Sequence, residues 1–350
     1  MKKRFVILKN ELIDDHTNWI KACEKVQDKV DYETIDFLDG DQIKRVLKGS
    51  YDMILAKPPG ISANYKNLYD QTILLFSLSN IKIYPTPLEI FIYENKSFLY
   101  SWLSANELPH PDTSVFHYKN KALDFAKDAN YPLVAKTNIG ASGSGVKVLR
   151  NYKEAKDYIN ISFSKKGAPK RWGPNLEKGN IIGRGLQYLK NPSRISPKIK
   201  IYIAKKAEKQ QDIVLFQKFI PHTYEWRVVV IGESFFAHKK LKNGEKASGS
   251  LLKKYDRPPE KLLFFAKGIM ERFGFYSQAI DIFEDEYGSY YVNELQCIFG
   301  QSEPYQMLIE GKPGRFVFKN NEWIFEEGMY NENESYDLRI KHALLLAGSK

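Results

Sequence analysis

A lysine followed by a glycine-rich loop separates two short apolar segments near the middle of the chain. Residues 131–149 have the sequence YPLVAKTNIGASGSGVKVL, in which Lys136 ends the first apolar segment and Val146 begins the second. This pattern predicts a strand, a flexible loop and a second strand. Because glycine has no Cβ, the backbone N–H groups of such a loop can approach phosphate oxygens. Lys136 would add a point charge for the same phosphates.

The loop differs from the two common nucleotide-binding glycine loops. A P-loop has lysine and serine or threonine directly after its last glycine and then begins a helix. The glycine loop of dinucleotide-binding proteins also begins a helix. Here Gly145 is followed by Val-Lys-Val, which favours a strand. For this segment alone, an ordinary hairpin with a glycine turn is an equally good interpretation.

The size and charge of the chain limit its class. With 350 residues and 43% hydrophobic content, it is large enough to form two or three hydrophobic cores. The net charge of +11 is compatible with nucleic acid, with ATP and a second anionic substrate, or with a lysine-rich solvated surface. The lysines are spread along the chain and no nucleic-acid-binding motif occurs, so we expect no nucleic-acid partner.

The cysteines and the apolar segments indicate the compartment. Cys23 and Cys297 lie far apart and form neither a disulfide framework nor a zinc-binding spacing. The first apolar segment, Phe5–Leu8, is too short for a signal peptide, and no segment approaches the length of a membrane span. We therefore expect a cytoplasmic protein without a membrane span.

Residues 1–92 alternate between short strands and helices. Apolar strands are expected at Phe5–Leu8, Met53–Ala56 and Ile81–Tyr84, and a helix at Thr17–Val26. This alternation predicts an α/β domain with a parallel sheet. A second helix is expected between the last two strands, and its helical spacing predicts a buried face of Leu68, Thr72, Leu75 and Leu78.

The rest of the chain is predicted to form two α+β units. Residues 93–220 contain the glycine loop, and residues 221–350 contain strands, a helix over 259–273, a hairpin and a terminal helix. A helix after Glu94 is expected to bury Phe98, Leu99, Trp102 and Leu103. Residues 164–211 are rich in Lys, Arg, Gly and Pro with little periodicity, which favours a lid or a disordered insert.

Three polar residues near the end of the third unit form a candidate metal site. Residues 279–283 and 291–297 alternate as two strands joined by a turn, and period two places Glu294 and Gln296 on one face. Asp281 on the neighbouring strand could join them. Clustered carboxylates favour a bound cation, and oxygen ligands suit Mg²⁺ together with substrate phosphates. Solvent-facing positions on an amphipathic hairpin are the alternative.

Further candidate residues lie between the glycine loop and this acidic hairpin. The apolar strand Val214–Ile220 could hydrogen-bond an adenine edge through its backbone, and Glu225 could bind ribose hydroxyls. Arg227 could bind a transferring phosphate, and the basic segment ending at Lys240 is directed to the same place. A structural ion pair is the alternative for each charged residue taken singly.

The order of these segments resembles the ATP-grasp superfamily over residues 80–303, and most closely its ribosomal-protein glutamate ligase branch. Asn95-Lys96 and residues 108–113 (LPHPDT) match the start of the family's nucleotide-binding unit. The resemblance implies an N-terminal parallel α/β lobe and two α+β subdomains that clasp ATP. It implies nucleotide binding by Lys96, Lys136, Gly140, Ser142, Gly143, Ser144, Gly145, Gln217, Lys218, Phe219, Ile220 and Glu225. It also implies metal ligands at Asp281, Glu294 and Gln296, and catalytic roles for Arg227 and Lys240.

Three positions depart from the family pattern. Gln296 stands where the family has an asparagine metal ligand, and its side chain is longer by one methylene with the same amide oxygen. Lys218 replaces an acidic hinge residue. Lys246–Ser250 replaces an Arg-Xaa-Asn segment, so that phosphate ligand is not assigned.

The resemblance implies an ATP-dependent carboxylate–amine ligase that forms an acylphosphate. Its cofactors would be ATP and two Mg²⁺ ions, with Mn²⁺ as an alternative. Its substrates would be a small-molecule carboxylate and an amine. These substrates could be anionic, or linked to a glycan or a peptide. An ATP-grasp kinase and a non-catalytic ATP-binding module are the alternatives. The oligomeric state is open, with a homodimer among the options.

Overall fold

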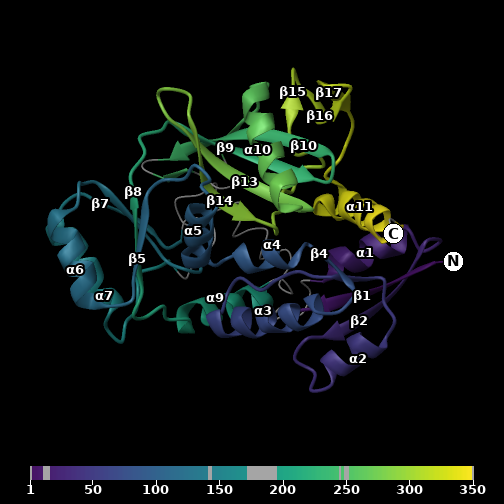
Figure 1. Cartoon of the computed structure of the whole chain (residues 1–350), viewed down its shortest axis with the longest axis horizontal. Helices are drawn as coiled ribbons and strands as arrows, with labels where there is room; N and C mark the ends of the chain where they lie inside the picture. Colours follow the sequence, from purple (N-terminus) through teal and green to yellow (C-terminus); the bar gives the residue numbers. More distant parts are fainter. Residues whose placement is uncertain are drawn as a thin grey trace.

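The computed structural model of the chain describes residues 2–10, 16–140, 144–171, 195–243, 246–247 and 252–348. These residues form three β-sheets with helices packed against them (Figure 1). The mixture of one parallel and two antiparallel sheets confirms the predicted α/β class with α+β lobes. The division of the chain at residues 92 and 220 stays a prediction.

The first sheet is parallel, as the alternation of strands and helices predicts. Its strand order is β2-β1-β3-β4, and the helices α1, α2 and α3 make the crossovers between its strands. The bounds are β1 Lys3–Lys9, α1 Thr17–Lys25, β2 Val30–Asp36, α2 Gln42–Lys48, β3 Met53–Leu55, α3 Ala63–Ser77 and β4 Lys82–Tyr84.

Helix α3 buries a different face from the one predicted. Leu68, Leu75 and Leu78 are 49%, 46% and 79% exposed, and only Thr72 of the predicted set is buried. The buried face includes Tyr69 and also Lys66. Lys66 can be buried because its Nζ donates hydrogen bonds to Asp70, one turn later in the helix. The full buried set is Lys66, Tyr69, Asp70, Thr72, Ile73 and Phe76. The prediction was wrong because it counted leucines and ignored an ion pair that satisfies both charges.

The second sheet carries the glycine loop. Its order is β5-β8-β6-β7, with β8 antiparallel to both of its neighbours, and the loop joins β6 to β7. The predicted strand–loop–strand arrangement is therefore confirmed. The bounds are α4 Pro87–Ile92, α5 Lys96–Ala105, β5 Thr113–Phe116, α6 Lys119–Asp128, β6 Leu133–Lys136, β7 Val146–Leu149, α7 Tyr152–Ser162 and β8 Val214–Lys218. Helix α5 buries Leu99 and Leu103 as predicted, whereas Phe98 is exposed and Trp102 is half-buried.

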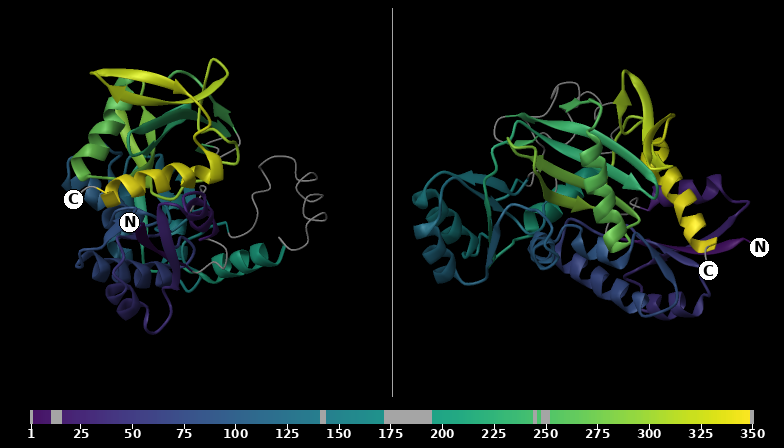
Figure 2. Two further views of the ribbon diagram at one scale, coloured as in Figure 1. Left: turned by 90° about the vertical axis from the view of Figure 1, so that its right-hand side faces the viewer. Right: turned by 45° about the horizontal axis from the view of Figure 1, so that its top comes forward.

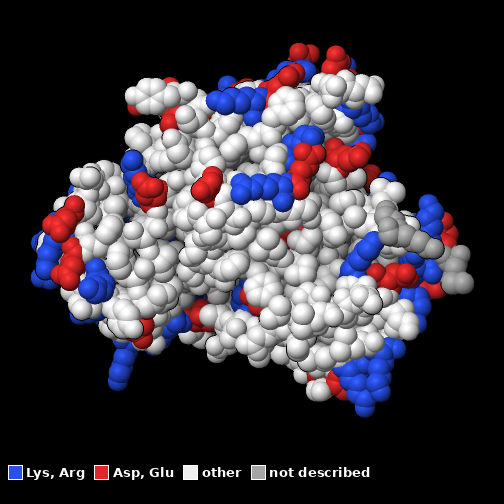
Figure 3. All heavy atoms as spheres, in the orientation of Figure 1, with Lys and Arg blue, Asp and Glu red and all other residues white. Residues whose placement is uncertain are grey.

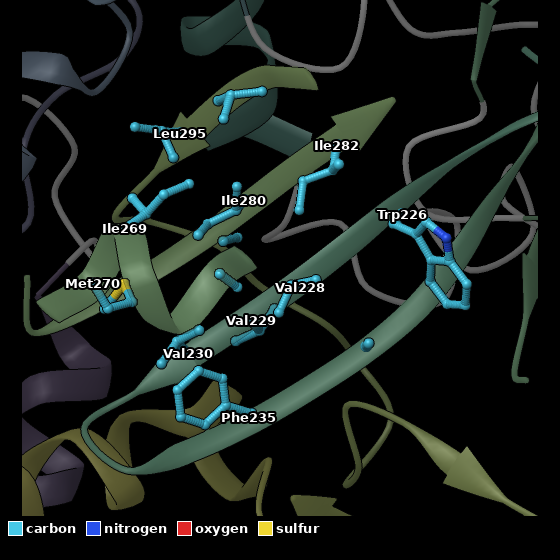
Figure 4. Packing of buried hydrophobic residues seen from close by; sticks show 14 of the residues in the cluster. Trp226, Val228, Val229, Val230, Phe235, Ile269, Met270, Ile280, Ile282 and Leu295 are labelled. Atoms are coloured by element: carbon cyan, nitrogen blue, oxygen red, sulfur yellow. The ribbon is translucent and has the colours of Figure 1, made fainter. Parts of the chain in front are cut away.

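The third sheet is antiparallel and has two different faces. Its central order is β14-β13-β9-β10-β16-β15, with β11, β12 and β17 attached at the side. One face packs Val228, Ile280 and Leu295 against Ile269 of helix α10 (Figure 4). The bounds are β9 Tyr224–Ile231, β10 Ser234–Asn243, β11 Lys246–Ala247, β12 Lys253–Lys254, α10 Glu260–Phe273, β13 Ser277–Glu284, β14 Tyr290–Gln296, β15 Leu308–Ile309, β16 Lys312–Lys319 and β17 Glu322–Glu327. The opposite face is polar and carries the candidate site.

The basic insert is partly helical. Helix α9, Ile195–Ala207, lies inside the segment that we expected to be a lid or disordered, whereas residues 172–194 lie outside the described residues. After α9, Glu208 accepts a hydrogen bond from the first N–H of α3 at 3.1 Å. Gln210 bonds both the N–H and the C=O of Ile139 at the start of the glycine loop. The end of the insert is thus tied to the loop and to α3.

The C-terminal helix joins the first and third sheets. Helix α11, Tyr336–Gly348, follows a 3₁₀ turn at Glu332–Ser335 and lies between these sheets (Figure 2). Tyr336 packs its ring against Trp19 with centroids 4.8 Å apart, and Ile340 belongs to the same buried cluster. No helix among the described residues combines the length and the apolar character needed to cross a bilayer.

The surface charge is distributed rather than concentrated on the face shown in Figure 3. Basic and acidic side chains are interspersed over the N-terminal unit and the C-terminal hairpin, and an uncharged area lies between them. Among the described residues, several surface charges form exposed ion pairs, such as Arg45 with Glu33 and Lys312 with Glu327.

Candidate functional site

A pocket of about 380 Å³ lies between the second and third sheets. Its walls come from β6, β7 and β8 on one side and from β9, β10, β13 and β14 on the other. A volume of this size is typical of sites for small-molecule ligands. Residues from separate parts of the chain therefore meet around one space.

One end of the pocket is largely apolar. Val134 of β6 and Val148 of β7 form one wall, and Phe283 of β13 contributes the other. Gln217–Ile220, the predicted hinge, also lines this pocket. Gln217 is buried and donates to Thr113 at 3.1 Å. A flat aromatic ring with polar edges suits such a slot.

Lys136 is a buried cation whose hydrogen-bond partners among the described residues are neutral. Its Nζ donates to Tyr100 Oη at 2.6 Å and to Asn293 Oδ1 at 2.7 Å. Among the described residues, no carboxylate lies within 4 Å of this Nζ, and burial lowers the pKa of Lys136 to about 8. A buried charge held only by neutral partners is unfavourable until an anion binds.

Asn293 reaches this lysine because strand β14 contains a bulge. Asp281 pairs with Glu294 and Ile282 pairs with Val292, so Asn293 has no partner in the register. A bulge lets two successive residues face the same side of a sheet. Both Asn293 and Glu294 consequently line the pocket, which strict alternation would not allow.

Lys96 lies beside the glycine loop and the acidic hairpin. Its Nζ is 3.1 Å from Glu294 Oε1 and donates to the C=O of Gly140 at 3.4 Å. Burial would lower the pKa of Lys96, but Glu294 and Glu94 raise it well above its usual value. Glu94 accepts the N–H of Gly140 at 2.7 Å. The start of α5 therefore anchors the start of the loop.

The glycine loop returns closely onto Thr137. The N–H of Thr137 donates to the C=O of Gly145 at 3.0 Å, and a Cβ on Gly145 would lie 1.8 Å from Thr137 Oγ1. Glycine is therefore required at this position. Ser144 accepts the N–H of Arg171 at 2.8 Å through its C=O. Ser142 and Gly143 lie outside the described residues.

Arg227 and Asp281 form a bidentate ion pair in the centre of the polar sheet face. Arg227 Nε donates to Asp281 Oδ1 at 2.7 Å, and Nη2 donates to Oδ2 at 2.8 Å. These residues are directly opposite on β9 and β13. Burial would raise the pKa of Asp281, but Arg227 and Lys240 outweigh burial and lower it. The carboxylate is therefore ionised over the whole physiological range.

Lys240 connects two carboxylates on the same face. Its Nζ donates to Glu225 Oε2 at 2.8 Å and to Asp281 Oδ2 at 2.7 Å. Burial would lower the pKa of Lys240, but Asp281 and Glu225 raise it. His222 lies 3.9 Å from the other oxygen of Glu225, and burial lowers its pKa. One Glu225 oxygen thus remains without a short cationic contact among the described residues.

Asp281, Glu294 and Gln296 fit a hard cation by their donor chemistry. Asp281 and Glu294 are opposite each other on β13 and β14, and Gln296 lies on the same face. Burial would raise the pKa of Glu294, but Lys96 reverses the effect and lowers it, so both carboxylates are charged. Mg²⁺ is usually held by one or two carboxylates together with substrate phosphates. The described residues contain no cluster of three or more His, Cys, Asp or Glu side chains that could hold a metal alone.

The sequence matches no known family model and no curated protein. Solved structures match over most of its length. N5-carboxyaminoimidazole ribonucleotide synthetase from Thermotoga maritima has a TM-score of 0.55 at 15% identity, covering 99% of this chain and 76% of that one. D-alanyl-alanine synthetase A from Vibrio cholerae has a TM-score of 0.54 at 12% identity, with 87% and 91% covered. Both are ATP-grasp proteins. The chain has the ATP-grasp fold.

The similarity to solved ATP-grasp structures agrees with the order of segments along the chain. It does not show to which branch of the superfamily the chain is most similar. N5-carboxyaminoimidazole synthase from Aspergillus clavatus also matches, with a TM-score of 0.54 at 10% identity and with 98% of this chain and 77% of that one covered. Ligases of different substrates are thus about equally similar. The closer resemblance to the glutamate ligase branch stays a prediction.

Most of the predicted site residues come together around this pocket. Those that line the pocket are Lys96, Lys136, Gly140, Gln217, Lys218, Phe219, Ile220, Glu225, Arg227, Lys240, Asp281, Glu294 and Gln296. Ser144 and Gly145 belong to the loop above it but do not line it. The roles of these residues stay predictions.

Sequence reasoning missed several residues of the pocket. They are Tyr100, Asn293, His222, His238, Lys253, Gln301 and Gln306. His238 had a visible signal, because it lies two positions before Lys240 and alternation places both on one face. Its pKa is lowered to about 3 by burial and by the adjacent Arg227, so it is neutral. Asn293 lies at the bulge, and His222, Gln301 and Gln306 lie in loops whose geometry the sequence does not indicate. Tyr100 on α5 and Lys253 on β12 reach the site through tertiary contacts.

The affinity for ATP should fall above pH 8 because Lys136 loses its proton there. A bound polyphosphate favours charged Lys136, and the free protein has a pKa of about 8 at this position. By linkage, affinity is full below pH 8 and decreases as the pH rises, by about fivefold between pH 8 and pH 9. Equilibrium ATP binding across this range measures the effect. In Lys136→Met the affinity should be lower and nearly independent of pH; a variant with the wild-type pH slope would contradict this assignment.

Proposed function

We propose that the protein is an ATP-dependent carboxylate–amine ligase that acts through an acylphosphate and releases ADP and phosphate. The observation that carries this proposal is the pocket itself. Two buried lysines, Lys96 and Lys136, and two ionised carboxylates, Asp281 and Glu294, line one cavity that has an apolar end. This arrangement suits a magnesium-bound nucleoside triphosphate.

The nucleotide would occupy the pocket in a defined direction. Its adenine fits the apolar end next to Gln217–Ile220, and the free oxygen of Glu225 is suited to ribose hydroxyls. Lys96, Lys136 and the glycine loop would bind phosphates. Asp281, Glu294 and Gln296 would hold Mg²⁺, which supplies charge neutralisation of the phosphates when bound.

Arg227 and Lys240 are placed to stabilise charge where the phosphoryl group is transferred. A carboxylate oxygen of the acceptor attacks the γ-phosphorus, the bond to the bridging oxygen breaks, and ADP leaves with that electron pair. The amine then attacks the acyl carbon, phosphate leaves, and the nitrogen loses a proton to solvent. Arg227 is oriented by its bidentate contact with Asp281. Such preorganised donors stabilise developing negative charge without further reorganisation.

The ligands bound in two structurally similar ATP-grasp proteins support this proposal. The biotin carboxylase domain from Hydrogenobacter thermophilus, with a TM-score of 0.53 at 14% identity, was solved with MgADP, ADP and bicarbonate. The Aspergillus clavatus synthase was solved with ADP and 5-aminoimidazole ribonucleotide. Each was thus solved with a nucleotide and a further small anion.

Trapping with hydroxylamine tests the reaction type. Purified protein is incubated with ATP, Mg²⁺, hydroxylamine and pooled carboxylates, and both hydroxamate and free phosphate are measured. A ligase forms the two products in equal amounts, because hydroxylamine replaces the amine and captures the acylphosphate. Formation of a stable phosphorylated product without free phosphate would instead indicate a kinase. Mg²⁺-dependent ATP binding without turnover on any pool would indicate a non-catalytic module.

A further inference from the structure

The polar face of the third sheet changes from acidic to basic across its strands. In one row, Glu294, Asp281, Arg227 and His238 lie opposite one another on β14, β13, β9 and β10. In the next row, the order is Phe283, Glu225, Lys240 and Lys253, and Lys253 lies on β12. Directly opposite residues of antiparallel strands face the same side. Carboxylates therefore gather at the β13–β14 side and cations at the β10–β12 side.

Lys253 is the cation at the basic end of this face, and its charge is poorly compensated. Its side chain is 12% exposed, and its Nζ donates to the neutral Gln301 Oε1 at 2.7 Å. Among the described residues, one carboxylate lies within 4 Å of Lys253 Nζ. It belongs to Glu303, its Oε2 is 3.6 Å away, and the Glu303 side chain is 43% exposed to solvent. Lys240, its neighbour across the strands, has two buried carboxylates at hydrogen-bond distance.

Neutral polar groups complete the wall around Lys253. Gln301 is buried and its amide nitrogen donates to the C=O of Tyr305 at 2.5 Å, which fixes the orientation of the amide. Gln306 is buried beside it and donates to Asn331 at 2.7 Å. Both glutamines, together with Gly300 and Lys253, line the same pocket as Arg227. The basic end is thus a rigid recess rather than a solvated surface.

We propose that Lys253 and the Gln301 wall bind a second anionic group of the acceptor, so that the enzyme selects acceptors with two anionic groups. The proposal rests on the ligase function above and adds the class of its carboxylate substrate. The reacting carboxylate lies near Arg227, and the second group, also a carboxylate, contacts Lys253. Lys253 on β12 is two strands away from Arg227 on β9 and is offset from it by two residues along the strands. These spacings place the two Cα atoms about 12 Å apart. Two long cationic side chains at this separation suit a short, flexible dianion.

Direct binding tests this assignment without turnover. The complex of the protein with Mg²⁺ and a non-hydrolysable ATP analogue is titrated calorimetrically with the dicarboxylates from malonate to adipate and with the monoamide of each. At least one dicarboxylate should bind about tenfold or more tightly than its monoamide, as expected for a charge-assisted hydrogen bond. Lys253→Met should reduce the affinity for that dicarboxylate to the level of its monoamide.

Lys254→Met is the matched control. Lys254 is the next residue of β12, its side chain is 60% exposed, and it pairs with Asp256 at 3.0 Å. This variant should keep the wild-type preference for the dicarboxylate. The assignment is overturned if no member of the series binds, if the monoamides bind equally well, or if Lys253→Met keeps the preference. Because the assay needs no phosphoryl transfer, a negative result in hydroxylamine trapping would count against the ligase function separately.

Discussion

Replacement of Arg227 by alanine should reduce kcat by about 10²–10³ and leave the affinity for ATP within about threefold. The guanidinium is held by Asp281 in the centre of the polar sheet face, where it can stabilise charge that develops during phosphoryl transfer. Its contribution is therefore expected mainly in the transition state. Asp281 still accepts a hydrogen bond from Lys240 in this variant, so the carboxylate does not lose all compensation.

Arg315→Ala is the matched control for this experiment. Arg315 also donates two hydrogen bonds to a carboxylate, from Nε and Nη2 to Glu326 Oε2, but it lies on β16 outside the pocket. Its removal should leave kcat unchanged. Steady-state kinetics, ATP binding and thermal unfolding are measured for both variants. Equal losses of kcat and ATP affinity in Arg227→Ala would contradict a role in the transition state.

Glu294→Gln should abolish most activity by weakening the metal site. The substitution keeps the shape of the side chain but removes the charge that faces Lys96 at 3.1 Å. Replacing a residue that only hydrogen-bonds a metal ligand typically lowers metal affinity or activity ten- to hundredfold. Replacing a residue that binds the metal directly should lower them at least as much. We therefore expect the Mg²⁺ concentration needed for half-maximal turnover to rise by about tenfold or more.

Glu284→Gln provides the comparison for the metal experiment. Glu284 lies three positions after Asp281 on β13 and accepts hydrogen bonds from Tyr224 and Trp226 outside the pocket. Its replacement should not change the dependence on Mg²⁺. Activity is measured over a Mg²⁺ titration at fixed ATP, with Mn²⁺ as a second ion. If Glu294→Gln kept the wild-type Mg²⁺ dependence, the proposed metal site would be wrong.

The sequence predicted the polar sheet face because strand periodicity is simple. Residues 279–283 and 291–297 alternate, the turn between them is short, and their pairing places Asp281 opposite Glu294. Arg227 and Lys240 were expected at this site from the resemblance to the ATP-grasp superfamily, and the register places Arg227 opposite Asp281 and Lys240 opposite Glu225 on adjacent strands. Two-residue periodicity carries enough information to assign one face of an antiparallel sheet.

The parts that could not be predicted depend on irregular geometry or on tertiary contacts. The bulge that brings Asn293 to Lys136 interrupts the alternation without a glycine or proline to mark it. Lys253 lies on the two-residue strand β12 and gains its position only from pairing with β10. On α3, a buried lysine pairs with Asp70, so the apolar pattern gave the wrong face. Loops such as 299–306 contribute Gln301 through contacts distant in sequence.

Binding of ATP with and without Mg²⁺ is the most direct test of the single pocket on which this account depends. We predict that the wild type binds ATP in the presence of Mg²⁺, that chelation weakens binding about tenfold or more, and that Lys136→Met weakens it to a similar degree. ATP binding that needs neither Mg²⁺ nor Lys136 would contradict the account, because the carboxylates of β13 and β14 and the lysine of β6 would then not act on one nucleotide.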